Sequence, residues 1–263
     1  MLGACKKSTN DDTSNFNISV SGKIKRIIYS DPVHRKASIK TFEYDGNNRI
    51  TKLNYWMEDS SYTPIAIPYQ ANSLLSYSGL NEFPNKNIIT HESGWIDSTL
   101  FYYDSQNRVT QEDFLSANQV AARNTYSYIS AGTVLNKYYV LTGSTLQLST
   151  SDSLFYDLQN KLLEIKSYAN NGSYRGNSLF EYDNKINPLA RISAFNYIYS
   201  LTSDDFGLNN KAPNNLLKIV DNQLSSTYIT NYSLNYSLNS FPISGTSTTN
   251  TSSTSSTIKY EYY

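Results

Sequence analysis

Two histidines are the only imidazole groups in the chain, and their neighbours decide whether they could bind a metal. They are His34 and His91. A zinc site built on them would need a third ligand, such as Asp31 or Glu92, brought close by the fold. Neither histidine belongs to a helical pair four residues apart, so we interpret both as loop or strand-edge residues. The sequence therefore predicts no metal site and no cofactor.

Neighbouring carboxylates are the other candidates for catalysis, because a glycosidase places two carboxyl groups across a cleft. Such doublets occur at four places: Asp11-Asp12, Glu58-Asp59, Glu112-Asp113 and Asp204-Asp205. Consecutive residues of a strand point to opposite faces, so we expect these doublets to be solvated surface. The chain also lacks nucleophile-elbow, phosphate-binding and dinucleotide-binding motifs. No catalytic residue is predicted, and we expect the protein not to be an enzyme.

The single cysteine, Cys5, is a candidate for covalent modification. It follows Leu2-Gly3-Ala4 and precedes a polar run, Lys6 to Asn15. This tetrapeptide resembles a bacterial lipobox, whose cysteine takes a diacylglyceryl group, and the polar run resembles a flexible tether. The charged and apolar parts of a signal peptide are missing before Cys5, through either an upstream start or trimming. The resemblance predicts a membrane anchor and a place in the bacterial cell envelope, at the outer membrane.

Composition excludes several classes of protein. The 22 basic and 22 acidic residues balance to a net charge of zero, with no basic cluster, so we expect no nucleic-acid partner. No run approaches the roughly 18 apolar residues of a membrane-spanning helix. The chain holds 24 tyrosines. A tyrosine ring packs on a pleated sheet while its hydroxyl reaches water or a partner, which favours a sheet with one wet face.

A short phrase recurs along the chain: an aromatic residue one or two positions before a Tyr-Asp pair, then variable residues, then Asn and, in three copies, a base and an aliphatic residue. The Tyr, Asp and Asn positions are Tyr44, Asp45 and Asn48; Tyr103, Asp104 and Asn107; Tyr156, Asp157 and Asn160; and Tyr182, Asp183 and Asn187. The aspartate is typical of the start of a type I turn, and asparagine tolerates positive φ better than other non-glycine residues. Each copy is therefore predicted to turn a hairpin, with positive φ at Asn48, Asn107 and Asn160.

The phrase resembles the YD repeats of RHS-type proteins, with asparagine where those turns have glycine. It is more similar to a family of Bacteroidetes lipoproteins of unknown function. The similar features are Tyr182 to Pro188, the Asn-Asn pairs Asn209-Asn210 or Asn214-Asn215, and the aromatic end Ile258 to Tyr263. This resemblance implies a porin-like or barrel-like antiparallel sheet and a lipid-binding label. Its motifs describe turns and do not describe a site.

Strict alternation indicates strands. Large side chains occupy even positions from Tyr228 to Leu238, and small polar ones occupy the odd positions from Asn231 to Ser237. Period two over this length predicts a half-buried strand whose even positions face the core. We expect a mobile loop over the Ser/Thr-rich run 244–257, and one or two helical turns are conceivable over 115–123.

These observations predict an all-β protein with a flexible tether over residues 1–17 and one antiparallel domain over 18–263. We expect a single meander of long hairpins, either a closed barrel or a strongly curled sheet. A membrane-spanning barrel is disfavoured because its outer face would include Lys259 and Glu261. Two functions stay open. One is a lipid-anchored envelope protein holding an apolar or lipid-like ligand inside the curl. The other is a structural or surface-interaction lipoprotein without a small ligand.

Overall fold

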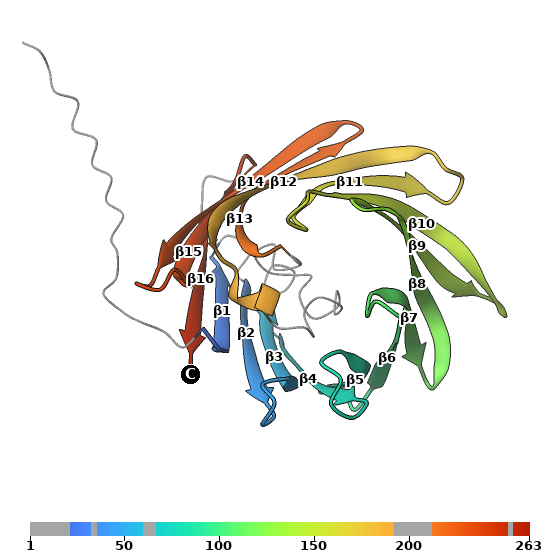
Figure 1. Cartoon of the computed structure of the whole chain (residues 1–263), viewed down its shortest axis with the longest axis horizontal. Coiled ribbons are helices and arrows are strands. Elements are labelled where there is room, and N and C mark those ends of the chain that lie inside the picture. The colour runs from blue at the N-terminus through green and yellow to red at the C-terminus, as the bar shows by residue number, and fades with distance from the viewer. Residues whose placement is uncertain (1–21, 33–35, 60–66, 192–211, 252–254) are drawn as a thin grey trace, which may run out of the picture.

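The computed structural model shows a closed antiparallel β-barrel of sixteen strands (Figure 1). It describes residues 22–32, 36–59, 67–191, 212–251 and 255–263. The strands are β1 (Ile24–Asp31), β2 (Lys36–Tyr44), β3 (Ile50–Asp59), β4 (Ile67–Tyr77), β5 (Pro84–His91), β6 (Ile96–Tyr103), β7 (Val109–Ser116), β8 (Gln119–Ser130), β9 (Thr133–Thr142), β10 (Thr145–Tyr156), β11 (Leu162–Ala169), β12 (Tyr174–Ile186), β13 (Asn214–Gln223), β14 (Ser226–Tyr236), β15 (Pro242–Thr249) and β16 (Ser255–Tyr262). A 3₁₀ helix, η1 (Pro188–Arg191), follows β12.

Each strand pairs with its sequence neighbours, and β1 pairs with β16 to close the ring. Ile27 lies opposite Tyr260 in that closing ladder. The predicted all-β meander is therefore confirmed, and of its two forms the closed barrel is the one present.

Cross-strand partners share a face, so the register sorts side chains into an inner and an outer wall. Phe42 lies opposite Leu53 on the inner wall, and Glu43 lies opposite Lys52 on the outer wall.

The barrel also has two ends. We call the end with the β2–β3, β6–β7 and β10–β11 turns the motif end, and the other the far end.

The apolar core lies on the inner wall of β1 to β6 and β16. Its buried members are Ile24, Ile27, Phe42, Ile50, Leu53, Leu75, Phe101, Leu189, Ile258 and Tyr260. Leu189 belongs to η1, the short orange helix that lies inside the ring of strands in Figure 1. The 3₁₀ helix therefore places Leu189, which follows β12 in the chain, in the same core as residues of the N-terminal strands.

Two expectations about local structure are wrong. Most of the Ser/Thr-rich run 244–257 forms β15 and β16, because barrel closure supplies backbone partners that its composition does not reveal. The segment 115–123 holds no helical turn. It forms the end of β7, a turn at Ala117 and Asn118 with positive φ, and the start of β8.

The alternation of β14 is confirmed only in the middle of the strand. Leu234 packs against the inner core and Tyr232 and Tyr236 are partly buried, whereas Asn231, Ser233 and Asn235 are exposed. The expectation is wrong at both ends: Tyr228 is 41% exposed, Leu238 is 60% exposed and Ser237 is buried. Tyr228 lies near the β13–β14 turn, and Leu238 lies in the turn after β14, where the strand's alternation no longer applies.

Candidate functional site

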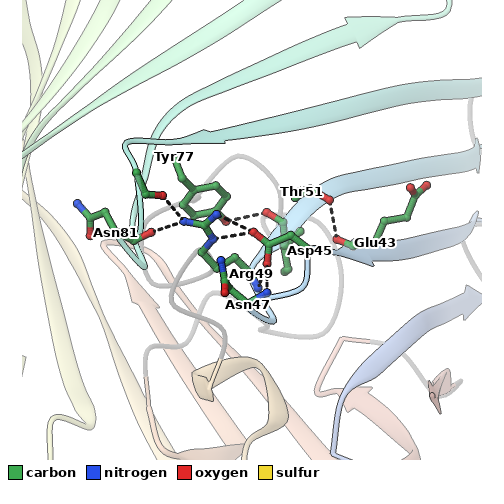
Figure 2. A network of polar contacts seen from close by, with 9 residues as sticks. Glu43, Asp45, Asn47, Arg49, Thr51, Tyr77 and Asn81 are labelled. Carbon is green, nitrogen blue, oxygen red and sulfur yellow. Dashed lines mark hydrogen bonds and ion pairs between the residues drawn. The ribbon is translucent and has the colours of Figure 1, made fainter.

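The first Tyr-Asp turn is held together by its aspartate. Asp45 Oδ1 accepts hydrogen bonds from the backbone N–H groups of Asn47 and Arg49, each at 2.9 Å. Its Oδ2 pairs with the Arg49 guanidinium at 2.7 Å. Figure 2 shows this pairing, with Arg49 between Asp45 and Tyr77. The hydrogen bonds, first from the Arg49 backbone, lower the pKa of Asp45, so the turn keeps its carboxylate ionised.

Arg49 also connects this turn to the β4–β5 turn, its neighbour at the motif end. Its Nη1 donates to the carbonyls of Gly79 and Asn81, both at 2.9 Å, and its guanidinium lies 4.5 Å from the centre of the Tyr77 ring. Such a stacked, hydrogen-bonded arginine restrains both turns.

The second and third turns repeat the geometry in part. Asp104 Oδ1 accepts from the Gln106 and Arg108 backbones, and Arg108 lies 4.0 Å from the Tyr128 ring. Hydrogen bonds, first from the Arg108 backbone, lower the pKa of Asp104. Asp157 accepts from the Gln159 and Lys161 backbones at 2.9 and 2.8 Å. Lysine lacks the planar guanidinium with which Arg49 and Arg108 pair with their aspartates. The third turn shares with the other two the backbone hydrogen bonds to its aspartate.

The predicted left-handed asparagines are present. Asn48, Asn107 and Asn160 have φ of 62°, 57° and 61°. Each donates its backbone N–H to the carbonyl of the turn's aspartate at 3.0 to 3.1 Å. These turns are therefore hairpin turns of the predicted kind.

The fourth copy, with Asp183 and Asn187, does not form a hairpin turn, so that prediction is wrong. Asp183 lies inside β12 and accepts hydrogen bonds from the Lys185 and Asn215 backbones and from the Tyr236 hydroxyl. Asn187 is absent from the residues with positive φ. Its side-chain oxygen instead accepts from the Leu189 backbone at 3.0 Å, which caps η1. The extra residue before Asn187 is the sequence signal of this difference.

A true fourth copy of the turn was missed because serine replaces its aspartate. Ser237 Oγ accepts from the Phe241 backbone at 3.2 Å, and Ser240 has φ of 66°. The Ser240 N–H donates to the Ser237 carbonyl at 3.0 Å, as the asparagines do in the other turns. The preceding Tyr236 was the available signal, since a tyrosine also precedes each aspartate.

Tyrosines at the ends of the even-numbered strands form what we call the tyrosine ring, at the motif end. Six of them donate to the carbonyl of the first residue of the preceding odd-numbered strand, at 2.6 to 2.9 Å: Tyr44 to Ile24, Tyr77 to Ile50, Tyr103 to Pro84, Tyr128 to Val109, Tyr182 to Leu162, and Tyr262 to Pro242. Tyr156 and Tyr236 occupy the matching places of β10 and β14. Burial raises the pKa of Tyr156 to about 12 and that of Tyr77 further. The motif tyrosines are therefore members of a structural ring.

The inner wall differs between the two halves of the barrel. On β1 to β6 many of its side chains are buried, including the polar residues Ser38, Lys40, Ser73, Asn87 and Thr99, whereas His91 and Asp97 at the far end are partly exposed. On β9 to β12 the inward side chains stay partly exposed, among them Asn136, Tyr138, Asp152, Ser167 and Ser178. An inward side chain in the middle of a strand can be exposed only to the barrel interior. The wall of β9 to β12 is thus the wetter one.

The doublet Glu112-Asp113 on β7, expected to be solvated surface, is buried, so that expectation is wrong. Buried Glu112 accepts from Asn124 Nδ2 at 3.0 Å and from the Tyr126 hydroxyl at 2.8 Å. Burial, followed by the Glu112 charge, raises the pKa of Tyr126. Burial also raises the pKa of Asp152.

A chain of four polar side chains lies at the far end, where β4, β5 and β6 meet the β5–β6 turn. The Tyr69 hydroxyl contacts His91 Nδ1, and His91 Nε2 contacts Asp97 Oδ2 at 3.0 Å. Trp95 Nε1 donates to Asp97 Oδ1 at 2.8 Å. We call these residues the rim cluster. Sequence reasoning singled out His91 only, because nothing in the linear pattern joins Tyr69 to Asp97.

The other histidine, His34, lies outside the described residues, as do Cys5 and the doublets Asp11-Asp12 and Asp204-Asp205. Among the described residues, no three His, Cys, Asp or Glu side chains gather where a metal ion could bind. Within the same ranges, no helix is long and apolar enough to cross a membrane.

The geometry defines a large single-sheet barrel with a structural ring at one end. No protein-family model matches the chain, and no curated protein matches it. A crystal structure of a porin-like protein from Bacteroides vulgatus matches with a TM-score of 0.57 and 12% identity, over 92% of this chain and 98% of that one. This likeness shows a shared fold.

Two further solved structures match less closely. A porin-like protein from Bacteroides uniformis gives a TM-score of 0.48 at 8% identity, over 93% of this chain and 99% of that one. A protein of unknown function from Bacteroides fragilis gives 0.24 at 13%, over 52% and 86%.

Proposed function

We propose that this protein is a lipid-anchored envelope protein whose barrel stands in water without spanning the membrane. In this proposal it is not an enzyme, and it acts by holding a ligand at its inner wall. The single observation that carries the proposal is the charge on the outer wall.

Ion pairs are spread around the outer wall. Lys52 pairs with Glu43 across β2 and β3, and Lys218 pairs with Glu181 across β12 and β13. Arg26 pairs with Glu261 across β1 and β16, beside Lys259. A lysine or arginine facing lipid at the bilayer midplane costs about 2–4 kcal/mol, so a wall with charges on so many strands favours water.

The inner wall favours a polar ligand over the apolar one expected from sequence. Its more exposed half presents Asn136, Asp152, Ser167 and Ser178, together with the Tyr138 ring. Asn136 and Ser178 already contact Asn124 and Asp221. An apolar ligand would remove water from the remaining hydrogen-bonding capacity of these groups, at about 1–3 kcal/mol for each neutral group left unsatisfied. A ligand with polar groups would avoid that cost.

The anchor is supported by the sequence around Cys5 and by the polar run behind it. Two or three acyl chains on one residue bind a membrane stably, whereas a single chain does not. The anchor would hold a water-exposed barrel at the membrane, which reconciles the charged outer wall with an envelope location.

Fractionation of cells expressing the full precursor tests the proposal. The wild-type protein should be in the membrane fraction and take up a fatty-acid label, and Cys5→Ala should lose the label and become soluble without detergent. Label uptake unchanged by Cys5→Ala would refute the anchor. A Cys5→Ala protein that still needs detergent would instead indicate a membrane-spanning barrel.

A further inference from the structure

The rim cluster has an unusual balance of hydrogen-bond donors and acceptors. The Asp97 carboxylate can only accept, so His91 Nε2 must carry the hydrogen in their 3.0 Å contact. A neutral imidazole protonated at Nε2 has a bare Nδ1, which accepts from the Tyr69 hydroxyl. For the neutral imidazole, the contacts therefore assign one tautomer and one direction to the hydrogen bonds from Tyr69 through His91 to Asp97.

With His91 neutral, every side-chain donor of the cluster is used within it. Tyr69 donates to His91, while His91 and the Trp95 indole both donate to Asp97. The remaining hydrogen-bonding capacity consists of lone pairs on the Tyr69 oxygen and on both Asp97 oxygens. A ligand that binds here must therefore supply donors.

The cluster is also accessible, and it is negatively charged. The Asp97 side chain is 38% exposed, and Trp95 is 54% exposed. Glu92, exposed in the same turn, adds a second negative charge. The nearby Tyr55 ring lies edge-on to Tyr69 at 6.1 Å and already has the Lys40 ammonium 5.5 Å from its centre.

We propose that the rim cluster binds the ammonium group of an organic amine. The ammonium would donate to Asp97 and to the Tyr69 oxygen, with the exposed Trp95 ring beside it. An ammonium has three donors, no acceptor and a positive charge, which matches what the cluster offers. Tyr69, His91 and Asp97 lie on the inner wall by their register on β4, β5 and β6. This inference therefore rests on the proposed function, because it names the class of ligand that this part of the inner wall would hold.

Other ligands fit less well. A saccharide hydroxyl both donates and accepts, and the cluster has no free donor for it. An inorganic anion would meet the charges of Asp97 and Glu92 without any donor. A neutral alcohol would lack the charge that pairs with Asp97.

Tryptophan fluorescence of the full-length protein tests the inference, since the chain has only Trp56 and Trp95. Trp56 lies on the outer wall, so Trp56→Phe leaves Trp95 as the reporter. Titration with 1,5-diaminopentane should give a saturable change, whereas its neutral isostere 1,5-pentanediol and the disaccharide maltose should not. No saturation by the diamine, or equal binding of the diol or of maltose, would overturn the assignment.

Variants locate the binding. Asp97→Asn should weaken diamine binding at least about tenfold, because a charge-assisted contact becomes neutral. Glu43→Gln removes one charge at the opposite end of the barrel and should change binding by less than about twofold, since salt screens that distance. Unaltered binding in a folded Asp97→Asn protein would refute the site.

If Asp97→Asn loses its β-sheet circular dichroism, Tyr69→Phe decides. It keeps the ring, removes one acceptor and should weaken diamine binding; unchanged binding would refute the site. Failure of the proposed function is distinguishable, because a membrane-spanning barrel would be revealed by fractionation whatever the diamine does.

Discussion

Single asparagines at the turns hold a backbone conformation that glycine usually supplies. Asn48, Asn107 and Asn160 have φ near 60°, in the left-handed region. Most residues pay about 1–2 kcal/mol there, because Cβ approaches the following carbonyl. Asparagine is enriched in this region, and the preceding aspartate organises the rest of each turn.

Substitution of Asn107 tests this cost. Asn107→Gly should be neutral or mildly stabilising, because glycine reaches positive φ freely but gains entropy in the unfolded chain. Asn107→Val should lower the free energy of unfolding by about 1 kcal/mol or more, since a β-branched residue is strained there. Urea unfolding measures both changes. Equal stability of the two variants would contradict the argument.

The tyrosine ring gives a second test at the scale of the residue. Tyr77→Phe removes the hydroxyl that donates to the Ile50 carbonyl at 2.6 Å but keeps the ring under Arg49. We expect a loss of about 1 kcal/mol in unfolding free energy. The matched control is Tyr102→Phe, on the outer wall and 43% exposed, which should change stability by less than about 0.5 kcal/mol. Equal effects would argue against the ring's hydrogen bonds.

At the scale of the element, the barrel is built from pairs of strands. In six pairs, an odd-numbered strand begins with a residue whose carbonyl accepts from the tyrosine near the end of the next strand. The turn after an even-numbered strand then starts the next pair. The recurrent Tyr-Asp phrase is the part of this unit that shows most clearly in the sequence.

Gly245 lies where β15 packs closely against β14. A Cβ at this position would lie 2.5 Å from Leu234 Cδ2 and 2.7 Å from the Ser233 carbonyl oxygen. Gly245→Ala should therefore destabilise the protein by about 1–3 kcal/mol through overpacking. Ser247→Ala, two residues along the same face, should cost less than about 0.5 kcal/mol. Thermal unfolding compares them, and an equally stable Gly245→Ala would show that the β14–β15 contact is loose.

At the scale of the whole molecule, buried tyrosines make the barrel sensitive to alkali. Burial raises the pKa of Tyr44, Tyr77, Tyr232, Tyr260 and Tyr262 above the ordinary value of 10.0. A group with a raised pKa in the folded state contributes its full stability below its unfolded pKa. That contribution is lost as the pH rises from about 10 toward the folded pKa.

Unfolding in alkali should therefore accompany ionisation of the buried tyrosines. Exposed tyrosines should titrate near pH 10, as absorbance at about 295 nm reports. The buried group should ionise at higher pH in the same cooperative transition that abolishes the β-sheet circular dichroism. Titration of every tyrosine near pH 10 with the circular dichroism intact would contradict the burial of these tyrosines.

The sequence by itself determined the features that depend on neighbours in the chain. Alternation predicted the strand that includes Tyr228 to Tyr236 and the inward face of its middle. The spacing of Asp and Asn predicted three turns with their backbone geometry, because both are local properties. The same local reading failed at Asp183, where Asn215 and Tyr236, distant in sequence, bind the aspartate. It also missed the turn at Ser237, because there a serine hydroxyl accepts the backbone hydrogen bond that an aspartate accepts in the other turns.

Only the tertiary structure decided the features that need strands far apart in the chain. The pairing of β1 with β16 chose the closed barrel over the curled sheet. Closure also turned a Ser/Thr-rich run into strands, because a ladder satisfies backbone groups whatever the side chains are. The rim cluster joins Tyr69, His91 and Asp97 through the register of three strands, which alternation alone does not determine.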